Sequence, residues 1–229
     1  MIEDRTTSTH TATVDRYLET IYYIAAEGDV VRPSRLSNWL GVSAPTVSEA
    51  LRRLERDGWI TTAPDRSVTL TSDGESIARA IVRRHRVLER WLTDTLGFDW
   101  AAADVEAERI AGAISDEVIS RIDASMGAPT TCPHGNPIPG RDPGHGILTS
   151  LADVAVGESA LVRRLSEVAE HEGQPLLQQL SDSGVAEGSE VTVTSRDGAG
   201  HMVLTVGATR VELSRRMAGT IWTSPLAAN

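Results

Sequence analysis

The stretch "GVSAPTVSEALRRLERDGWI", residues 41–60, decides how the N-terminal part of this chain folds. Ser43 is a favourable helix N-cap, and Pro45 is tolerated in the first turn because an N–H group there has no intrahelical partner. Apolar residues follow at helical spacing, at Val47, Leu51 and Leu54. Gly58 ends the pattern, so we predict an amphipathic helix over about residues 43–56 whose first turn is small and polar.

The segments around this helix predict a winged helix-turn-helix. Residues 11–27 carry apolar side chains at helical spacing up to Gly28, and Ser34 is positioned to cap a second short helix that ends before Gly41. After the third helix, "WITTAPDRSVTLT" at 59–71 contains two β-rich runs around a Pro-Asp-Arg turn, which predicts a hairpin. Three short helices followed by a two-stranded hairpin are the pattern of this DNA-binding motif.

This motif predicts double-stranded DNA as a partner, with the third helix in the major groove. Small polar residues at the start of that helix can reach base edges, and nearby arginines can contact phosphates. The residues expected at this surface are Arg32, Arg35, Ser43, Pro45, Thr46, Ser48, Glu49, Arg53 and Arg66. Residues 32–73 are close to electrically neutral, whereas the whole chain has a net charge of -10. A winged helix used for protein contacts is the less favoured alternative.

The composition excludes several classes of protein. With 229 residues the chain can hold a sizeable core, and its acidic balance argues against a general nucleic-acid binder covered in basic residues. The single cysteine, Cys132, excludes an intramolecular disulfide framework and a cysteine-based zinc finger. No apolar run reaches the roughly 18 residues of a membrane span, and the start "MIEDRTTSTH" lacks the regions of a signal peptide. We therefore expect a cytoplasmic protein with no membrane partner.

The rest of the chain predicts a helical region followed by a β-rich one. Helices are expected at about residues 72–96, 100–113 and 115–126. Residues 127–146 are saturated with proline and glycine and predict a linker or ordered loop, in which we interpret Cys132 and His134 as loop residues. Strand-like alternation with glycine turns then predicts a small β-barrel over about residues 149–226.

Histidine and carboxylate residues in this region could bind a divalent metal ion. His85 and Glu89 are four residues apart on one predicted helix, so both project from the same face. Asp104 lies on the next helix, and Glu167 and Glu170 add two acids from the β-rich region. A donor set of this kind without thiolate suits manganese, iron or zinc, and additional carboxylates favour manganese. For His85 and Glu89 alone, an exposed ion pair is the alternative.

Several stretches resemble the diphtheria toxin repressor family of metal-dependent regulators, including its iron-dependent and manganese-responsive branches. The likeness is carried by "DRYLETIYYI", "SAPTVSEALRRLERDGWI", "RSVTLTSDGE", "RRHRVLERWLTDTLGFDW", "ISDEV" and, most distinctively, "PHGNPIPG" at 133–140. The resemblance implies a mainly α fold with β: an N-terminal winged helix-turn-helix, a helical dimerisation domain and a C-terminal SH3-like, FeoA-like β-barrel. Combined with our boundaries, the domains are 1–73, 74–140 and 149–229, with a linker at 141–148.

The resemblance also implies two metal sites, of which one is retained in this sequence and the other is degenerate. The family's ancillary site falls on His85, Glu89, Asp104, Glu167 and Glu170, with Asp104 in place of a histidine. The family's primary site is degenerate. Its N-terminal ligand falls on Arg16, one ligand is retained as Glu108, and its Glu-His pair is replaced by Ala111 and Gly112. Arg16 and Glu108 could form a salt bridge in place of the cation.

The expected function is that of a homodimeric, metal-dependent repressor of metal-homeostasis genes that binds a DNA operator. The expected cofactor is Mn²⁺ or Fe²⁺, with Zn²⁺ or Co²⁺ as substitutes in vitro, and no small organic ligand is predicted. A second hypothesis is a regulator of the same family that binds DNA without metal because its primary site is lost. A third is a metal-storage or enzymatic protein, but the sequence contains no nucleophile with a base and no phosphate-cradling glycine loop.

Overall fold

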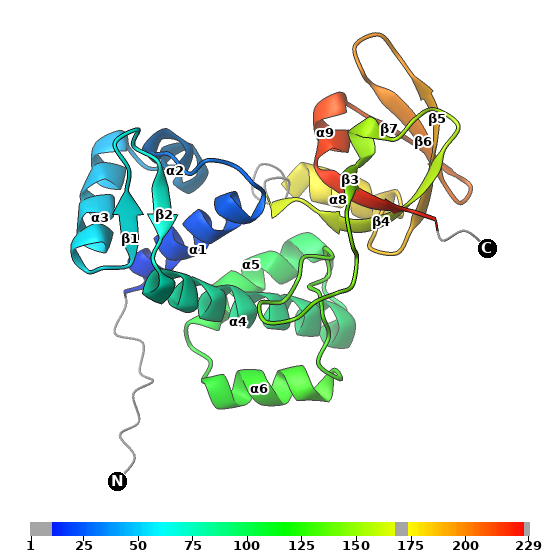
Figure 1. Ribbon diagram of the computed structural model, residues 1–229. Helices are drawn as coiled ribbons and strands as arrows, with labels where there is room; N and C mark the ends of the chain where they lie inside the picture. The colour runs from blue at the N-terminus through cyan, green and yellow to red at the C-terminus, as the bar shows by residue number, and fades with distance from the viewer. Residues whose placement is uncertain (1–10, 168–173, 227–229) are drawn as a thin grey trace. The chain divides into compact units, whose positions relative to one another are not determined.

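The computed structural model describes residues 11–167 and 174–226 and consists of two compact units (Figure 1). The first unit runs to Val82 and the second starts at Arg83, so the division falls within the long helix α4 (Ser72–Leu96). Within the described residues, no helix combines the length and the apolar character needed to cross a membrane. The three domain boundaries expected from the sequence stay a prediction.

The first unit contains the expected three helices and hairpin. Its elements before α4 are α1 (Ala12–Ala26), α2 (Pro33–Leu40), α3 (Ala44–Arg56), β1 (Ile60–Thr62) and β2 (Val68–Leu70). The two strands pair antiparallel, with Ile60 opposite Leu70. The predicted cap of α3 is confirmed, because the Ser43 hydroxyl accepts a hydrogen bond from the Thr46 N–H at 3.3 Å. The apolar stripe of α3 is buried, as expected, at Val47, Leu51 and Leu54.

Helix α2 begins differently from the prediction. Ser34 was expected to cap this helix, but α2 starts at Pro33 and its N-cap is Arg32, whose side chain makes no capping hydrogen bond. Proline favours the first helical position because its φ angle is already helical and its missing N–H has no partner there. The local preference of Pro33 therefore outweighs the capping preference of Ser34.

The helical part of the second unit contains the end of α4, α5 (Trp100–Ala111) and α6 (Asp116–Ser125). These helices agree with the prediction, although α5 and α6 end slightly earlier than expected. Asp123 of α6 is buried and accepts hydrogen bonds from Arg83 of α4 and from Arg141 of the following loop. Two arginines on one buried carboxylate fix α6 and this loop to α4.

The proline- and glycine-rich loop is a tight turn packed on the β-sheet. The Cys132 N–H donates to the Asn136 carbonyl at 2.9 Å, and the Leu165 N–H donates to the His134 carbonyl at 2.8 Å. Gly135 has a φ of 80°, and a Cβ there would lie 1.9 Å from the Arg163 carbonyl oxygen. Only glycine permits this close approach, so the turn is held rigidly against the strand that contains Leu165.

The C-terminal part of the second unit is a six-stranded antiparallel sheet in the order β3-β8-β4-β5-β6-β7. Its strands are β3 (Thr149–Ser150), β4 (Ser159–Leu165), β5 (Glu190–Arg196), β6 (Met202–Val206), β7 (Thr209–Leu213) and β8 (Ile221–Pro225). The 3-10 turn η1 (Leu151–Asp153) and the helices α8 (Gln174–Asp182) and α9 (Arg215–Gly219) complete this part. Its core is built from the inward residues of the strands, including Val162, Val193, Leu204 and Ile221.

Candidate metal centre and DNA-binding surface

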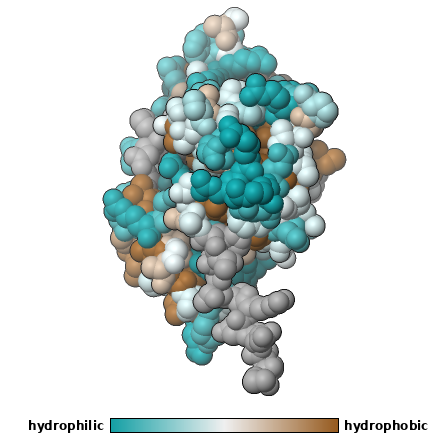
Figure 2. All heavy atoms as spheres, turned by 90° about the vertical axis from the view of Figure 1, so that its left-hand side faces the viewer, coloured by the Kyte–Doolittle hydropathy of each residue, from teal (hydrophilic) through white to brown (hydrophobic). Residues whose placement is uncertain are grey.

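The first turn of α3 is exposed, as a groove-reading helix requires. Ser43, Pro45 and Thr46 are exposed, and Ser48 is half-buried with its hydroxyl donating to the Ala44 carbonyl at 2.9 Å. The face of the molecule that carries α3 gathers hydrophilic side chains in Figure 2. Glu49 is also exposed and pairs with Arg52 at 2.7 Å. Small polar groups are therefore available at the N-terminal end of α3.

The arginines of this surface fall into two groups. Arg32 donates to the Asp65 carbonyl at 2.7 Å and lies 3.2 Å from the Asp65 carboxylate, and Arg35 lies over the ring of Trp39 at 5.6 Å. Arg53 and Arg66 are exposed and make no salt bridge with any described residue. The second pair therefore keeps its charge available for phosphates, whereas Arg32 and Arg35 already have partners.

Two elements of the second unit bring three predicted metal ligands together. His85 and Glu89 come from α4 and Asp104 from α5, and one donor atom of each lies within 4.8 Å of the other two. His85 Nε2 lies 3.3 Å from an Asp104 oxygen and 3.8 Å from Glu89 Oε2. His85 and Glu89 are buried, and the Asp104 side chain is 37% exposed. The alternative of an ion pair between His85 and Glu89 agrees with their distance, but its expected exposure is wrong, because both residues are buried.

The burial of Glu89 indicates that this group fits a cation. Its side chain is 2% exposed, and Oε1 has no hydrogen-bond partner among the described residues. A buried carboxylate oxygen without a hydrogen bond is costly, because the water that it loses is not replaced. The other oxygen, Oε2, is the one that lies 3.8 Å from His85 Nε2. A divalent cation held by His85, Asp104 and this oxygen would compensate the burial of the Glu89 charge, and this donor set suits Mn²⁺ or Fe²⁺.

Of the two acids expected from the β-rich region, Glu167 is not part of this group among the described residues. Glu167 is buried and forms an ion pair with Arg86 of α4, and Arg86 also donates to the Pro137 carbonyl. The sequence did not indicate Arg86, whose positive charge lies beside Glu167, one of the acids predicted to bind the metal ion. Glu170 lies outside the described residues. The roles of Glu167 and Glu170 as metal ligands stay predictions.

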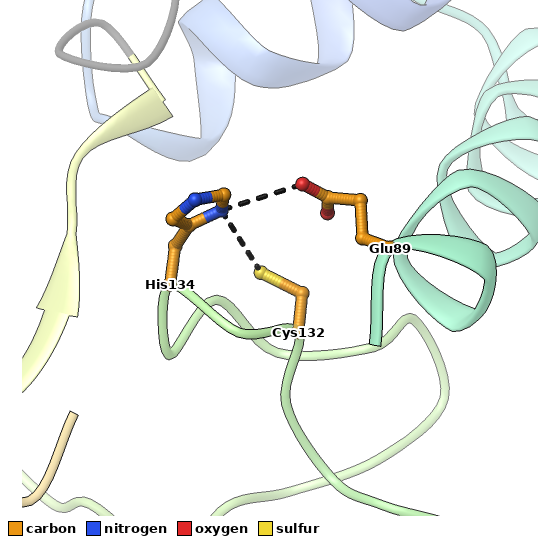
Figure 3. A group of neighbouring side chains, drawn as sticks. All are labelled: Glu89, Cys132 and His134. Atoms are coloured by element: carbon orange, nitrogen blue, oxygen red, sulfur yellow. Dashed lines mark hydrogen bonds and ion pairs between the residues drawn. The ribbon is translucent and has the colours of Figure 1, made fainter. Parts of the chain in front are cut away.

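Sequence reasoning also missed Cys132 and His134. They lie in the loop, as expected, but both are buried, and with Glu89 they form a second group of donors within 4.8 Å of one another. In Figure 3 the three side chains point toward one another, Glu89 from a helix and the other two from the loop. The only sequence signal was the spacing of two donor side chains within a turn restricted by proline and glycine.

Three family models match the chain in succession. Residues 9–68 match the N-terminal DNA binding domain of iron dependent repressors, and residues 71–140 match their metal binding and dimerisation domain. Residues 149–225 match the FeoA domain. The chain belongs to the iron-dependent repressor family. The expected resemblance and fold class are thereby confirmed, and this family member is a DNA-binding transcriptional regulator with a metal-binding and dimerisation domain.

Relatives of known function resemble this family member over most of its length. The iron-dependent repressor IdeR of Mycobacterium tuberculosis is 35% identical over 91% of this chain and 95% of its own. The diphtheria toxin repressor of Corynebacterium efficiens is 37% identical over 91% and 94%. A solved manganese-dependent transcriptional repressor complex with manganese has a TM-score of 0.80 and 32% identity, covering 93% of this chain and 100% of its own. All three of these relatives are repressors.

The positions assigned to the family's primary metal site lie in separate units. Arg16 is exposed on α1 in the first unit, and Glu108 is exposed on α5 in the second. Ala111 and Gly112, at the end of α5, offer no side-chain ligand. The salt bridge between Arg16 and Glu108 stays a prediction.

Proposed function

We propose that this family member is a cytoplasmic, homodimeric repressor that binds DNA when Mn²⁺ or Fe²⁺ occupies a site formed by His85, Glu89 and Asp104. The observation that carries the proposal is the Glu89 carboxylate, which is buried and has one oxygen within 4.8 Å of donor atoms of His85 and Asp104. Two carboxylates with one imidazole favour Mn²⁺ or Fe²⁺, and Zn²⁺ or Co²⁺ can substitute in vitro. Glu167 and Glu170 are proposed as further ligands.

A bound divalent ion supplies the positive charge that two neighbouring carboxylates need when they are held together. Without that charge, Glu89 and Asp104 repel each other across the contact between α4 and α5. His85 presents Nε2 toward both, so an ion held by the three side chains would fix α4 and α5 relative to each other. Metal binding therefore favours one arrangement of the helical domain over others, which shifts a pre-existing equilibrium.

DNA recognition is proposed to use α3 in a two-fold arrangement. In a homodimer, two copies of α3 enter successive major grooves of a roughly palindromic operator. Ser43, Pro45, Thr46 and Ser48 contact base edges, and Arg53 and Arg66 contact phosphates. The target genes proposed for repression are those of metal homeostasis.

The proposal is tested by selecting operator sequences and then measuring DNA binding with and without the metal. Purified protein is used to select binding fragments from random DNA with Mn²⁺ or Fe²⁺, and affinity is then measured with metal and with excess chelator. We expect binding to fall at least roughly tenfold in chelator, and the metal response to be lost in His85→Ala. His201→Ala is the matched control, because His201 is exposed in the β5–β6 hairpin. A full metal response in His85→Ala would refute the site.

A metal-independent regulator is the second candidate, and the loss of the primary-site residues at Ala111 and Gly112 is the observation in its favour. In that version an ion pair between Arg16 and Glu108 keeps the dimer competent. It requires unchanged operator binding in excess chelator and a loss of binding in Arg16→Ala. The burial of the Glu89 carboxylate beside His85 and Asp104 favours the metal-dependent version.

A further inference from the structure

Glu49 lies at the centre of the exposed face of α3, the helix proposed to enter the major groove. The buried stripe of this helix consists of Val47, Leu51 and Leu54. Successive residues of an α-helix are rotated by about 100°, so the Glu49 side chain projects roughly 140–200° away from each residue of the stripe. That side chain is 61% exposed. A helix that packs through this stripe therefore presents Glu49 in the middle of its outward surface.

A carboxylate at this place opposes DNA binding unless it makes a specific contact. DNA carries one negative charge per about 1.7 Å of its axis, so an acidic side chain near the groove is repelled. The other acid of α3 serves the fold, because the Glu55 carboxylate accepts the Thr62 N–H at 2.9 Å and ties the helix to β1. Among the described residues Glu49 has no such role, since its partner is Arg52 of the same helix.

The ion pair with Arg52 leaves one oxygen of Glu49 available. Arg52 donates to Glu49 Oε2 at 2.7 Å, from three residues further along the helix. Oε1 makes no hydrogen bond to a described residue. The two side chains are 71% and 61% exposed, so the pair is weak and can rearrange when DNA binds. The guanidinium charge offsets the repulsion between Glu49 and the phosphates.

The four bases differ in what they offer to a carboxylate in the major groove. An ionised carboxylate only accepts hydrogen bonds. Guanine presents two acceptors, and thymine presents an acceptor and a methyl group. Adenine presents an amino donor beside an acceptor, N7, that repels a carboxylate, whereas cytosine presents only the amino donor at N4. A carboxylate in the groove therefore favours cytosine over the other three bases.

We propose that Glu49 is a specificity-determining residue, which selects cytosine at one position of each operator half-site by accepting a hydrogen bond from the N4 amino group. Arg52 is a positioning residue that holds the carboxylate and offsets its charge. In a homodimer, the two copies of Glu49 place the two cytosines symmetrically on opposite strands of the operator. The inference deepens the proposed function and rests on its assignment of α3 to the major groove.

Selection from random DNA in the presence of Mn²⁺ tests the proposal, with the full-length wild type and the variants Glu49→Ala, Glu49→Gln and Arg52→Ala. We expect a cytosine in each half-site of the wild-type motif. Glu49→Ala should lose the preference at this position and keep the rest of the motif. Glu49→Gln should accept adenine there, because an amide both donates to N7 and accepts from the amino group. Arg52→Ala should keep the cytosine but bind every sequence more weakly.

Binding measured by fluorescence anisotropy gives the size of the effect. Replacement of both cytosine–guanine pairs by thymine–adenine should weaken wild-type binding at least roughly tenfold, but that of Glu49→Ala less than about twofold. Glu106→Gln is the matched control, because Glu106 forms the same type of i,i+3 ion pair with Arg109 on α5. This control should discriminate like the wild type. Far-ultraviolet circular dichroism checks that each variant is folded.

Two results would overturn the proposal. If Glu49→Ala selects the wild-type motif at every position, Glu49 is a solvated partner of Arg52 and reads no base. If the cytosine preference is kept in Glu49→Ala but lost in Arg52→Ala, the contact belongs to Arg52 and the guanine of that base pair. Failure of the proposed function looks different, because the wild type then selects no motif with Mn²⁺ or Fe²⁺, or a motif that Thr46→Ala also leaves unchanged.

Discussion

The DNA-reading surface and the metal centre are built in opposite ways. The surface is a single exposed helix, α3, with the hairpin after it, and its residues are close together in the sequence. The metal centre collects side chains from α4, α5 and a loop that are up to about fifty residues apart, and all of them except Asp104 are buried. Exposed groups interact weakly and almost independently, whereas buried groups depend on one another. Substitutions should therefore have larger effects in the metal centre than on the reading surface.

The largest effect is expected where the loop meets the sheet. Gly135→Ala places a Cβ against the Arg163 carbonyl in a backbone with positive φ, so we expect a loss of unfolding free energy of about 3 kcal/mol or more. Gly112→Ala is the matched control, since its Cβ would meet no atom within 4 Å. Urea denaturation of both variants measures the difference. Equal stability of the two would show that the turn adjusts freely.

Loss of Glu89 should have the next largest effect, on metal binding. Because Glu89 is the buried carboxylate of the proposed site, Glu89→Gln should reduce the affinity for Mn²⁺ by about 100-fold. Glu106→Gln, on α5 and paired with Arg109, is the control for a lost carboxylate. Isothermal titration calorimetry with Mn²⁺ measures the change. An unchanged affinity in Glu89→Gln would exclude Glu89 as a ligand.

On the reading surface, we expect a smaller effect from Arg53→Ala. The loss of one phosphate contact should weaken operator binding roughly 3- to 10-fold and lower the slope of log affinity against log salt by about 0.9. Arg32→Ala should cost less, because Arg32 is already paired with Asp65. Fluorescence anisotropy over a series of salt concentrations measures both. A larger loss of affinity for Arg32→Ala than for Arg53→Ala would show that Arg32 contacts a phosphate despite its pairing with Asp65.

The smallest effect is expected for the pKa of Asp65, in the turn between β1 and β2. Hydrogen bonds from the Ser67 hydroxyl and N–H are the main reason that the pKa of Asp65 lies below its ordinary value. The stability that this ionised group provides is present above the unfolded pKa and is lost as the pH falls through the lower folded pKa. Ser67→Ala should raise the pKa of Asp65, as measured by NMR titration. An unchanged pKa would assign the shift to Arg32 instead.

The comparison of the two regions explains which predictions from the sequence succeeded. Ser43, Pro45 and Gly58 fix the ends of α3 through backbone chemistry that involves only near neighbours, so the winged helix could be predicted. The pair His85 and Glu89 could be predicted because the helical repeat places both on one face. The start of α2 was misplaced because two local preferences, those of Pro33 and Ser34, compete within one turn.

The features that could not be predicted depend on contacts between segments that are distant in the sequence. No spacing indicates that Arg86 lies against Glu167, or that Cys132 and His134 face Glu89 and not solvent. Their positions follow from the packing of the loop turn on β4, where Gly135 allows the close approach. Burial depends on how the chain packs. The order of these residues in the sequence therefore could not show which charged groups are paired with each other.

The sequence by itself determined the helices, the hairpin, the β-rich region and the reading face, because each depends on propensities and periodicities within a few turns. Only the tertiary structure decided which acids are left for a cation and which are paired with arginine. The physical reason is that desolvation and ion pairing act through space, between groups that the chain brings together only when it has folded.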